Sequence, residues 1–239
     1  MSNQLLSIVI PIYNEELVIA HLHEKMERFR VQFPMPMEII LVDDGSTDRS
    51  PALLKRWEKN ARSVFVTTLP KNSGHQAALQ AGLDQASGDY VITMDADLQD
   101  PIETIADLVE KSREGFDIVH AQRLQRDGEG TFRLAGAWMF YRLLHMLDSK
   151  ALHEVGDFRL LTRNAHRHYL KSGRRIFMRG ETIHLPFPQA VIGYKRHPRF
   201  AGKSKFSLRK LFALAWMGFR SSSVQSTAAD QANETSPAS

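Results

Sequence analysis

The chain of 239 residues contains no cysteine. It therefore has no disulfide, no thiolate nucleophile and no thiolate metal ligand, so any metal must be held by oxygen or imidazole groups. Long apolar runs are missing too, since the best one, 211–219, is far short of the roughly 20 residues that cross a bilayer. The first residues also lack the pattern of a secretory signal. We therefore expect a cytoplasmic protein that does not span the membrane.

The glycine pattern of dinucleotide-binding dehydrogenases is absent as well. The first apolar run, 7–11, leads into Ile12-Tyr13-Asn14 rather than into G-x-G-x-x-G, which disfavours a dehydrogenase of that kind. No recognised DNA- or RNA-binding motif is present, so nucleic acid is not an expected partner.

Charge is distributed unevenly along the chain, although the net charge is only +4. Residues 1–158 carry 16 Lys and Arg against 24 Asp and Glu, whereas residues 159–210 carry 14 Lys and Arg against the single acid Glu181. This division predicts that the first part handles a cation and the second an anion, such as a phosphorylated substrate or a lipid head group.

Apolar runs and amphipathic stretches alternate along most of the chain. The runs predict strands at 7–11, 38–42, 63–68, 90–94 and 116–121, with a strand pair around Ile183 and 191–194. The amphipathic stretches predict helices at about 14–33, 50–60, 75–86, 101–114, 132–147 and 163–170, and a mobile loop at 122–130. This alternation is typical of an α/β fold with a mostly parallel sheet flanked by helices.

The segment Asp95-Ala96-Asp97-Leu98-Gln99-Asp100-Pro101 is the clearest candidate site. It places three carboxylates directly after the expected strand at 90–94, where burying them unpaired would be costly. Ligands of open α/β sheets bind beyond the carboxyl ends of the strands. We therefore expect these carboxylates to face a cleft and to hold a divalent cation or a basic ligand. Asp100 could instead cap the helix that follows Pro101.

A second acidic loop, 43–48, follows the strand at 38–42. Carboxylates there suit a ribose hydroxyl or a base N–H, because an ionised carboxylate only accepts hydrogen bonds. For Asp48 we favour a turn or a helix cap, and for Asp44 both interpretations remain open.

The segment 195–205 holds six basic residues among eleven when His197 is counted with the five Lys and Arg, with Gly202 as a hinge. Such a loop is either simply solvated or a clamp for phosphates beside the acidic site. Residues 206–220 predict an amphipathic helix that either lies in the interface of an anionic membrane or covers the sheet. The polar residues 221–239 are expected to be disordered.

Together, six motifs resemble those of the family 2 inverting glycosyltransferases, and within them the polyprenyl-phosphate sugar synthases of the dolichol-phosphate mannose and bactoprenol-phosphate glucose types. The motifs are Pro11-Ile12-Tyr13-Asn14-Glu15, Asp43 to Asp48, Asn72 with Gly74 to Ala78, Asp95 to Pro101, Gly156 to Leu160, and Arg199 with Gly202 to Lys205. The resemblance covers roughly residues 6–218. It implies a GT-A fold, a Rossmann-like mostly parallel sheet, over residues 1–205. Residues 1–121 would bind the nucleotide sugar and residues 122–205 the acceptor.

The resemblance also implies roles for individual residues. The nucleotide sugar would contact Pro11, Tyr13, Glu15, Asp43, Asp44, Asn72, Gly74, Gln76, Asp95, Ala96 and Asp97. Mg²⁺ or Mn²⁺ would be held by Asp95, Asp97 and Gln99. The donor diphosphate or the acceptor phosphate would contact Arg123, Arg133, Arg199, Lys203 and Lys205. The catalytic residues would be Asp97, Asp157 and Arg159.

The implied reaction is metal-dependent, inverting transfer of a hexose from a UDP- or GDP-sugar to a polyprenyl phosphate, for cell-envelope glycan assembly or glycosylation. A phosphate monoester has a second pKa of about 6, so at neutral pH its oxygen is largely ionised and no general base is obligatory. The enzyme would then be peripheral on the anionic cytoplasmic face of the membrane, with a second copy or a membrane protein as a possible partner.

Two other functions remain open at this point. A soluble transferase of polysaccharide synthesis would act on a sugar hydroxyl, which needs a positioned carboxylate, and Asp157 is a candidate for that base. The second is a catalytically weak scaffold of a membrane glycan-assembly complex, although a pure scaffold has no physical need for Asp95, Asp97 and Arg159.

Overall fold

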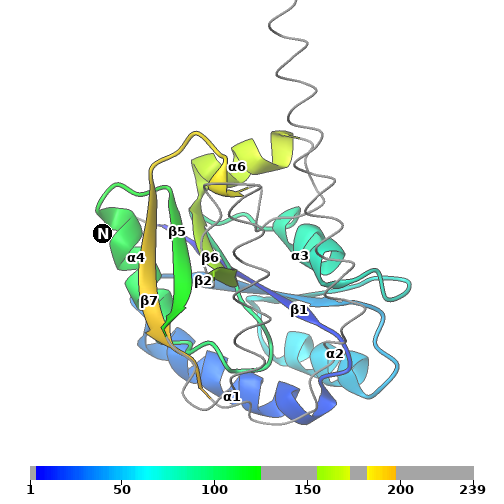
Figure 1. Ribbon diagram of the computed structural model, residues 1–239. Helices are drawn as coiled ribbons and strands as arrows, with labels where there is room; N and C mark the ends of the chain where they lie inside the picture. Colours follow the sequence, from blue (N-terminus) through cyan, green and yellow to red (C-terminus); the bar gives the residue numbers. More distant parts are fainter. Residues whose placement is uncertain (1–3, 125–154, 173–181, 198–239) are drawn as a thin grey trace, which may run out of the picture.

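The computed structural model describes residues 4–124, 155–172 and 182–197, and the structural statements below concern these residues. Figure 1 shows a single sheet with helices on both faces. The elements are, in chain order, β1 (Leu6–Ile12), α1 (Glu16–Gln32), β2 (Met37–Asp43), α2 (Ser50–Asn60), β3 (Val64–Thr68), α3 (His75–Leu83), β4 (Tyr90–Thr93), α4 (Thr104–Arg113), β5 (Ile118–Leu124), β6 (Val155–Thr162), α6 (Arg163–Lys171) and β7 (Gln189–Lys195).

The strands form one sheet in the order β3-β2-β1-β4-β6-β5-β7. β1 pairs in parallel with β2 and β4, β2 with β3, and β5 with β7. Only β6 runs against its neighbours, β4 and β5. The carboxyl ends of the parallel strands and the amino end of β6 therefore meet at one edge, called the carboxyl edge below. The predicted mostly parallel sheet is confirmed.

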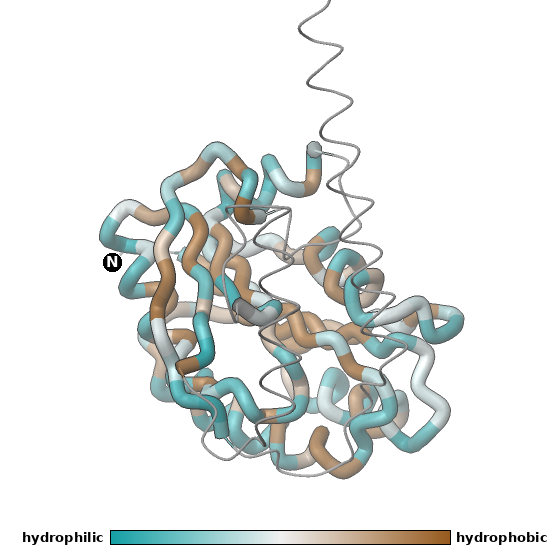
Figure 2. Tube along the Cα trace, in the orientation of Figure 1, coloured by the Kyte–Doolittle hydropathy of each residue, from teal (hydrophilic) through white to brown (hydrophobic). Residues whose placement is uncertain are grey.

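The strands are continuous apolar runs in the sequence because side chains on both faces of the sheet are buried. Leu6, Ile8 and Ile10 of β1 belong to the core cluster under α1, α2 and α4, whereas Val9 joins the cluster under α3 and α6. The strand pleat produces this division, because successive side chains point to opposite faces. Figure 2 shows the result as hydrophobic segments concentrated along the central strands.

Most predicted elements within the described residues agree with the structure to within three residues at each end, and α2 agrees at both ends. The strand around Ile183 is wrong, because Thr182 and Ile183 form a helical turn. The side-chain amide of Gln189 donates to the carbonyls of Thr182, Ile183 and Leu185. These carbonyls are thus satisfied without a neighbouring strand.

The loop predicted from residue 122 is also wrong at its start. Residues 122–124 continue β5 and pair with Gly193, Tyr194 and Lys195 of β7. The charged side chains misled the prediction, because a strand at the carboxyl edge can carry Arg123 toward a site instead of toward a core. Predicted elements at 132–147 and 206–220, and the tail 221–239, lie outside the described residues.

β6 is the strand that the sequence did not reveal. Its charged residues, Asp157 and Arg159, interrupt the apolar pattern that marks the other strands. In the sheet, Arg159 lies opposite Thr93 of β4 and His120 of β5 and is fully buried. Across the described residues, none of the helices is both long enough and apolar enough to span a bilayer.

Candidate functional site

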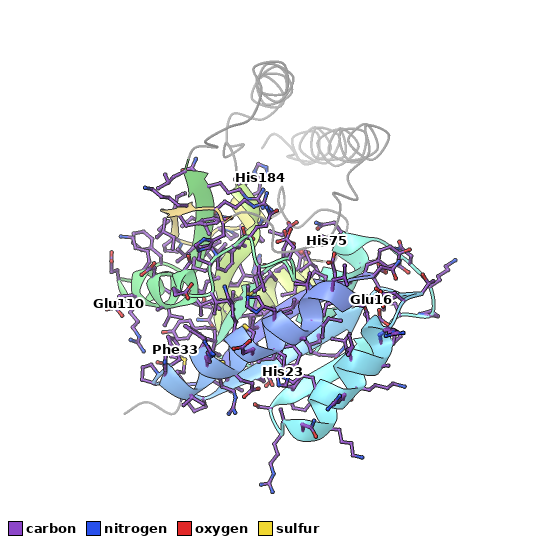
Figure 3. All side chains as sticks on the ribbon, turned by 90° about the horizontal axis from the view of Figure 1, so that it is seen from below. Glu16, His23, Phe33, His75, Glu110 and His184 are labelled. Atoms are coloured by element: carbon purple, nitrogen blue, oxygen red, sulfur yellow. The ribbon has the colours of Figure 1, made fainter. Side chains whose placement is uncertain are left out.

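The loops that follow β1, β2 and β4 gather at the carboxyl edge, together with the start of β6 and the end of β7. Figure 3 shows Glu16, at the start of α1, and His75, at the start of α3, toward this end of the sheet, with Phe33 and Glu110 toward the other. Open α/β sheets bind their ligands in this position. The candidate residues from distant motifs are therefore brought to one place.

The first two loops are locked to each other by hydrogen bonds. Asn14, with φ of 52°, accepts at Oδ1 from the N–H of Thr47 at 2.7 Å, and its own N–H donates to Ser46 Oγ at 2.9 Å. The Ser50 hydroxyl accepts from the N–H of Glu15 at 2.9 Å. The segment 11–15 is thus held rigidly against the acidic loop 43–48.

Both leading carboxylates of that loop are buried. Asp44 accepts at its two oxygens from the N–H groups of Ser73, at 2.7 Å, and Gly74, at 2.9 Å. Asp43 accepts at Oδ1 from the N–H of Ser46, while its Oδ2 is buried without a hydrogen-bond partner in the described part of the chain. Asp44 therefore holds the loop 71–74 in place, and Asp43 retains an acceptor oxygen. Asp48 has the predicted local role, because it accepts from the N–H of Ser50.

The remaining predicted nucleotide-sugar residues differ in accessibility. Pro11 and Ala96 are buried, Tyr13, Glu15, Gly74 and Gln76 are partly buried, and Asn72 is exposed.

The acidic segment after β4 contains a left-handed turn. Leu98 has φ of 58°, which is unfavourable for a residue with a side chain, and its side chain is buried in the core. Such strain persists only where the surroundings enforce it. Within this turn, Asp97 Oδ1 accepts from the N–H of Gln99 at 3.1 Å. Burial of Leu98 thus fixes the orientation of the Asp97 carboxylate.

Asp95 and Asp97 are suitable ligands for a hard divalent cation. Mg²⁺ is usually bound by one or two carboxylates, with substrate phosphates and water completing the shell. Within 4–124, 155–172 and 182–197, no three His, Asp or Glu side chains cluster to hold a metal by themselves. The side-chain amide nitrogen of Gln99 lies 3.4 Å from the His197 carbonyl, so the segment after β7 contacts the third predicted ligand. The donor set therefore fits a metal that is shared with a phosphorylated ligand.

Asp157 lies beside Asp95 because β6 is antiparallel to β4. The register pairs Thr93 with Arg159, so Asp157, two residues earlier in β6, lies just beyond the end of β4. His75 bridges the two acids: its Nε2 lies 3.0 Å from Asp157 Oδ2 and 3.6 Å from Asp95 Oδ1. Sequence reasoning missed His75, although it stands in the same motif as Gln76.

Donors surround the Asp157 carboxylate, which is only 2% exposed. Besides His75, the amide nitrogen of Gln76 lies 3.4 Å from Oδ2, and Nη2 of Arg159 lies 3.8 Å from Oδ1. These contacts orient the Asp157 carboxylate toward His75 and Gln76.

A buried polar chain supports Arg159. Its Nη2 donates to the Gly156 carbonyl at 2.7 Å and its Nη1 to the Thr182 hydroxyl. The Thr182 carbonyl accepts from the Gln189 amide, whose oxygen lies 2.9 Å from His120 Nε2. Burial, and then the charge of Arg159, lower the pKa of His120 to about 4. The imidazole is therefore neutral and donates from Nε2, because the Gln189 oxygen can only accept.

Arg123 lies at the carboxyl edge, whereas Arg133, Arg199, Lys203 and Lys205 are outside the described residues. The alternative that Asp100 caps a helix is not supported, because α4 begins only at Thr104. Asp100 instead accepts from the Tyr194 hydroxyl at 2.5 Å and lies 3.9 Å from Nη2 of Arg123. Burial, and then the charge of Asp95, raise the pKa of Asp100.

An open, mostly parallel sheet with carboxylates and arginines gathered at its carboxyl edge defines an α/β protein with a ligand site at that edge. Residues 7–170 match the model of the family described as glycosyl transferase family 2. An uncharacterized glycosyltransferase of Bacillus subtilis, YkcC, is 39% identical over 89% of this chain and 66% of its own length. The bactoprenol glucosyl transferase of Shigella phage SfV is 37% identical over 92% of this chain and 72% of its own. The chain therefore belongs to glycosyl transferase family 2, and the prediction of a glycosyltransferase is confirmed.

A solved structure agrees with this assignment at the level of the fold. The glucosyl-3-phosphoglycerate synthase of Mycobacterium tuberculosis, in complex with Mn²⁺, UDP and glucosyl-3-phosphoglycerate, has a TM-score of 0.59 and 20% identity, over 90% of this chain and 77% of its own. The predicted GT-A fold is confirmed. The chain spans about two thirds (66%) of the length of the Bacillus relative.

Proposed function

We propose that the protein transfers a hexose from a UDP- or GDP-sugar to a polyprenyl phosphate, with inversion at the anomeric carbon and with Mg²⁺ or Mn²⁺ as cofactor. The observation that carries this proposal is the environment of Asp157. A sugar hydroxyl acceptor needs a base, and this buried carboxylate is occupied by His75, Gln76 and Arg159. An acceptor phosphate is already ionised at neutral pH and needs no base. The bactoprenol glucosyl transferase name of the phage relative supports the same acceptor.

In this mechanism Asp95 and Asp97 would hold the metal at the end of β4. The metal, when bound, neutralises negative charge on the departing nucleoside diphosphate. Asp43 would accept a hydrogen bond from the nucleotide at its remaining oxygen. The guanidinium group of Arg123 would bind phosphate oxygens beside Asp95 and Asp97. Arg159 would act from within the sheet by orienting the start of β6, which carries Asp157.

The proposal also covers the parts of the chain outside the described residues. Residues 1–121 would form the nucleotide-sugar half and residues 122–205 the acceptor half. The helix at 206–220 would lie on the anionic cytoplasmic face of the membrane, where a lipid-linked acceptor is found, and a second copy or a membrane protein would be a partner. Mn²⁺ and UDP in the structure of the fold relative support a metal and a uridine nucleotide.

A donor and acceptor screen tests the proposal. The purified protein is incubated with UDP- or GDP-hexoses, Mg²⁺, Mn²⁺ or EDTA, and either a polyprenyl phosphate or the matching polyprenol. We expect a lipid-phosphate sugar that forms only with metal and only from the phosphate. Transfer to an oligosaccharide hydroxyl, with none to the polyprenyl phosphate, would contradict the proposal.

Asp97→Asn should reduce metal-dependent transfer by a factor of about 100 or more, because one ligand of the diphosphate-bound metal is lost. The rate at saturating metal is the measurement. Asp107→Asn is the matched control, since Asp107 is exposed on α4. If the Asp97 variant keeps full activity while folded, the metal assignment is wrong.

A further inference from the structure

Asp100 differs from the two acids that precede it. Its side chain is 1% exposed, and its Oδ1 accepts the Tyr194 hydroxyl at 2.5 Å. The same hydroxyl accepts from Nε of Arg123 at 3.1 Å. One oxygen atom of Tyr194 thus stands between a carboxylate and a guanidinium group and fixes the distance between them.

The surroundings of Tyr194 hold this arrangement in place. The ring of Phe158 packs edge-on against the Tyr194 ring, with centroids 5.7 Å apart and an angle of 81°. Gly156 provides room for Arg123, because a Cβ at that position would lie 3.1 Å from Nη2 of Arg123. β6 and β7 therefore both contact the Arg123 side chain.

A second guanidinium group, that of Arg196, approaches the same carboxylate. Its Nε lies 3.7 Å from Asp100 Oδ1, and its Nη2 lies 3.9 Å from Asp97 Oδ2. Both distances exceed hydrogen-bonding range. The Arg196 Nε is buried and donates to no acceptor within the described ranges. Burial, and then the charge of Arg123, lower the pKa of Arg196.

A purely structural ion pair at the opposite edge of the sheet has a different geometry. There Arg163 approaches Asp89 to 3.1 Å and also donates to the backbone carbonyl of Ser87 at 3.0 Å. Around Asp100, by contrast, Arg123 and Arg196 approach the carboxylates of Asp97 and Asp100 only to between 3.7 and 3.9 Å. A phosphate group between the two guanidinium groups would supply acceptors at closer range.

We propose that Arg123 and Arg196 together bind one substrate phosphate group, and that Tyr194 and Asp100 are positioning residues that hold the two arginines for it. The proposal rests on the proposed function and adds Arg196, Tyr194 and Asp100 to the site. Its ligand class is a phosphate monoester or a diphosphate, the two forms that the acceptor and the donor would present. The shared chemistry is a phosphate dianion between two guanidinium groups.

Binding is measured by calorimetry in EDTA, so that the metal site does not contribute, with phenyl phosphate and UDP as separate probes. Arg196→Gln should weaken binding of the preferred probe about tenfold through loss of charge-assisted hydrogen bonds. Tyr194→Phe removes only the hydroxyl and keeps the ring, and it should weaken binding about threefold to tenfold. Loss for phenyl phosphate assigns the site to the acceptor, and loss for UDP assigns it to the donor.

Two controls match these variants. Tyr90→Phe removes a hydroxyl that contacts Gln4 at the other end of β4, and Arg163→Gln breaks the structural pair with Asp89. We expect both to change binding less than twofold. Gly156→Ala displaces only Arg123 and should weaken binding without touching Tyr194, which keeps the test available if Tyr194→Phe fails to fold.

Unchanged binding in Arg196→Gln, or weakening by the control variants to the same extent, would overturn the proposal. Weaker binding in Arg196→Gln with unchanged binding in both Tyr194→Phe and Gly156→Ala would overturn the positioning role. In the transfer assay, Tyr194→Phe should raise KM for the phosphate substrate more than it lowers kcat. Because the probes bind without any transfer, failure of the polyprenyl-phosphate assay leaves this measurement interpretable.

Discussion

At the scale of single residues, two loops at the carboxyl edge can pack together because Gly45 has no side chain. Its φ is +66°, and a Cβ there would lie 2.5 Å from the carbonyl carbon of Lys71 and 2.6 Å from the amide nitrogen of Asn72. The loops 43–48 and 71–74 therefore contact each other through their backbones. Asp44 closes the same contact with two hydrogen bonds to the second loop.

Gly45→Ala should lower the free energy of unfolding by about 3 kcal/mol, because backbone strain and a backbone clash add together. Gly115→Ala is the matched control, since Gly115 has φ of +105° but nothing within 4 Å of an added Cβ. It should cost only about 1 kcal/mol. Urea unfolding of both variants measures the difference. Equal losses would mean that the two loops separate without cost.

His120 should make the fold sensitive to acid. Its pKa is lowered to about 4, so between that value and its unfolded pKa of 6.5 the unfolded chain binds more protons than the folded chain. Above about pH 6.5 His120 is neutral in both the folded and the unfolded chain, so it costs no stability there. The free energy of unfolding falls as the pH decreases toward 4. From pH 7.5 to pH 5 the expected loss is about 2 kcal/mol.

His120→Gln tests this prediction through its pH slope. The variant should lose about 2 kcal/mol less than the original protein between pH 7.5 and pH 5, whatever its stability at pH 7.5. His166, another buried imidazole with a lowered pKa, remains in both proteins and cancels in the comparison. Identical slopes would show that His120 is not held neutral.

At the scale of elements, β6 decides which residues share the site. Its antiparallel insertion between β4 and β5 places Asp157 beside Asp95 and buries Arg159. Gln189, at the start of β7, joins β6 indirectly, since its amide binds the turn at 182–185 and its oxygen binds His120. The site is thus supported by β6 and β7, which are distant in sequence from the acidic segment after β4.

Gln189→Leu should destabilise the fold by about 2–4 kcal/mol, because it removes the partner of several carbonyls and of His120. It should also slow transfer, since Thr182 then holds Arg159 less firmly. Gln85→Leu is the control: Gln85 is exposed, and among the described residues its side chain makes hydrogen bonds only with Thr67 and Ala81. Denaturant unfolding and initial rates are the measurements, and similar losses in both variants would count against the support network.

At the scale of the whole molecule, an acidic and a basic part of the chain contribute to the same site. The acidic part provides Asp95 and Asp97, and the basic part provides Arg159 and Arg196. The two parts meet at the carboxyl edge, where the proposed metal-bridged phosphate would require charges of both signs.

Removal of residues 206–239 should reduce co-sedimentation with vesicles that contain phosphatidylglycerol, and the remaining binding should fall further as salt increases. Vesicles of phosphatidylcholine alone are the control, because they offer no anionic head groups. Deletion that leaves binding to the anionic vesicles unchanged would retire the proposal of an interfacial helix.

The sequence by itself determined the alternation of strands and helices, the acidic segment at the end of β4 and the family. These features depend on apolar periodicity, on turn residues and on motifs whose members lie within a few positions of each other. Such short-range patterns are complete in the chain itself. The candidate metal ligands Asp95 and Asp97 can therefore be named from the sequence alone.

Only the tertiary structure decided that β6 is an antiparallel inner strand and that His75 bridges Asp95 and Asp157. It also decided that Asp100 lies beside Arg123 and Arg196 and does not cap a helix. Tyr194 and Asp100 are 94 residues apart in the chain, and His75 and Asp157 are 82 apart. Contacts over such separations are set by strand order and register, which no local pattern encodes. The physical reason is that strand order and register depend on how the whole core packs.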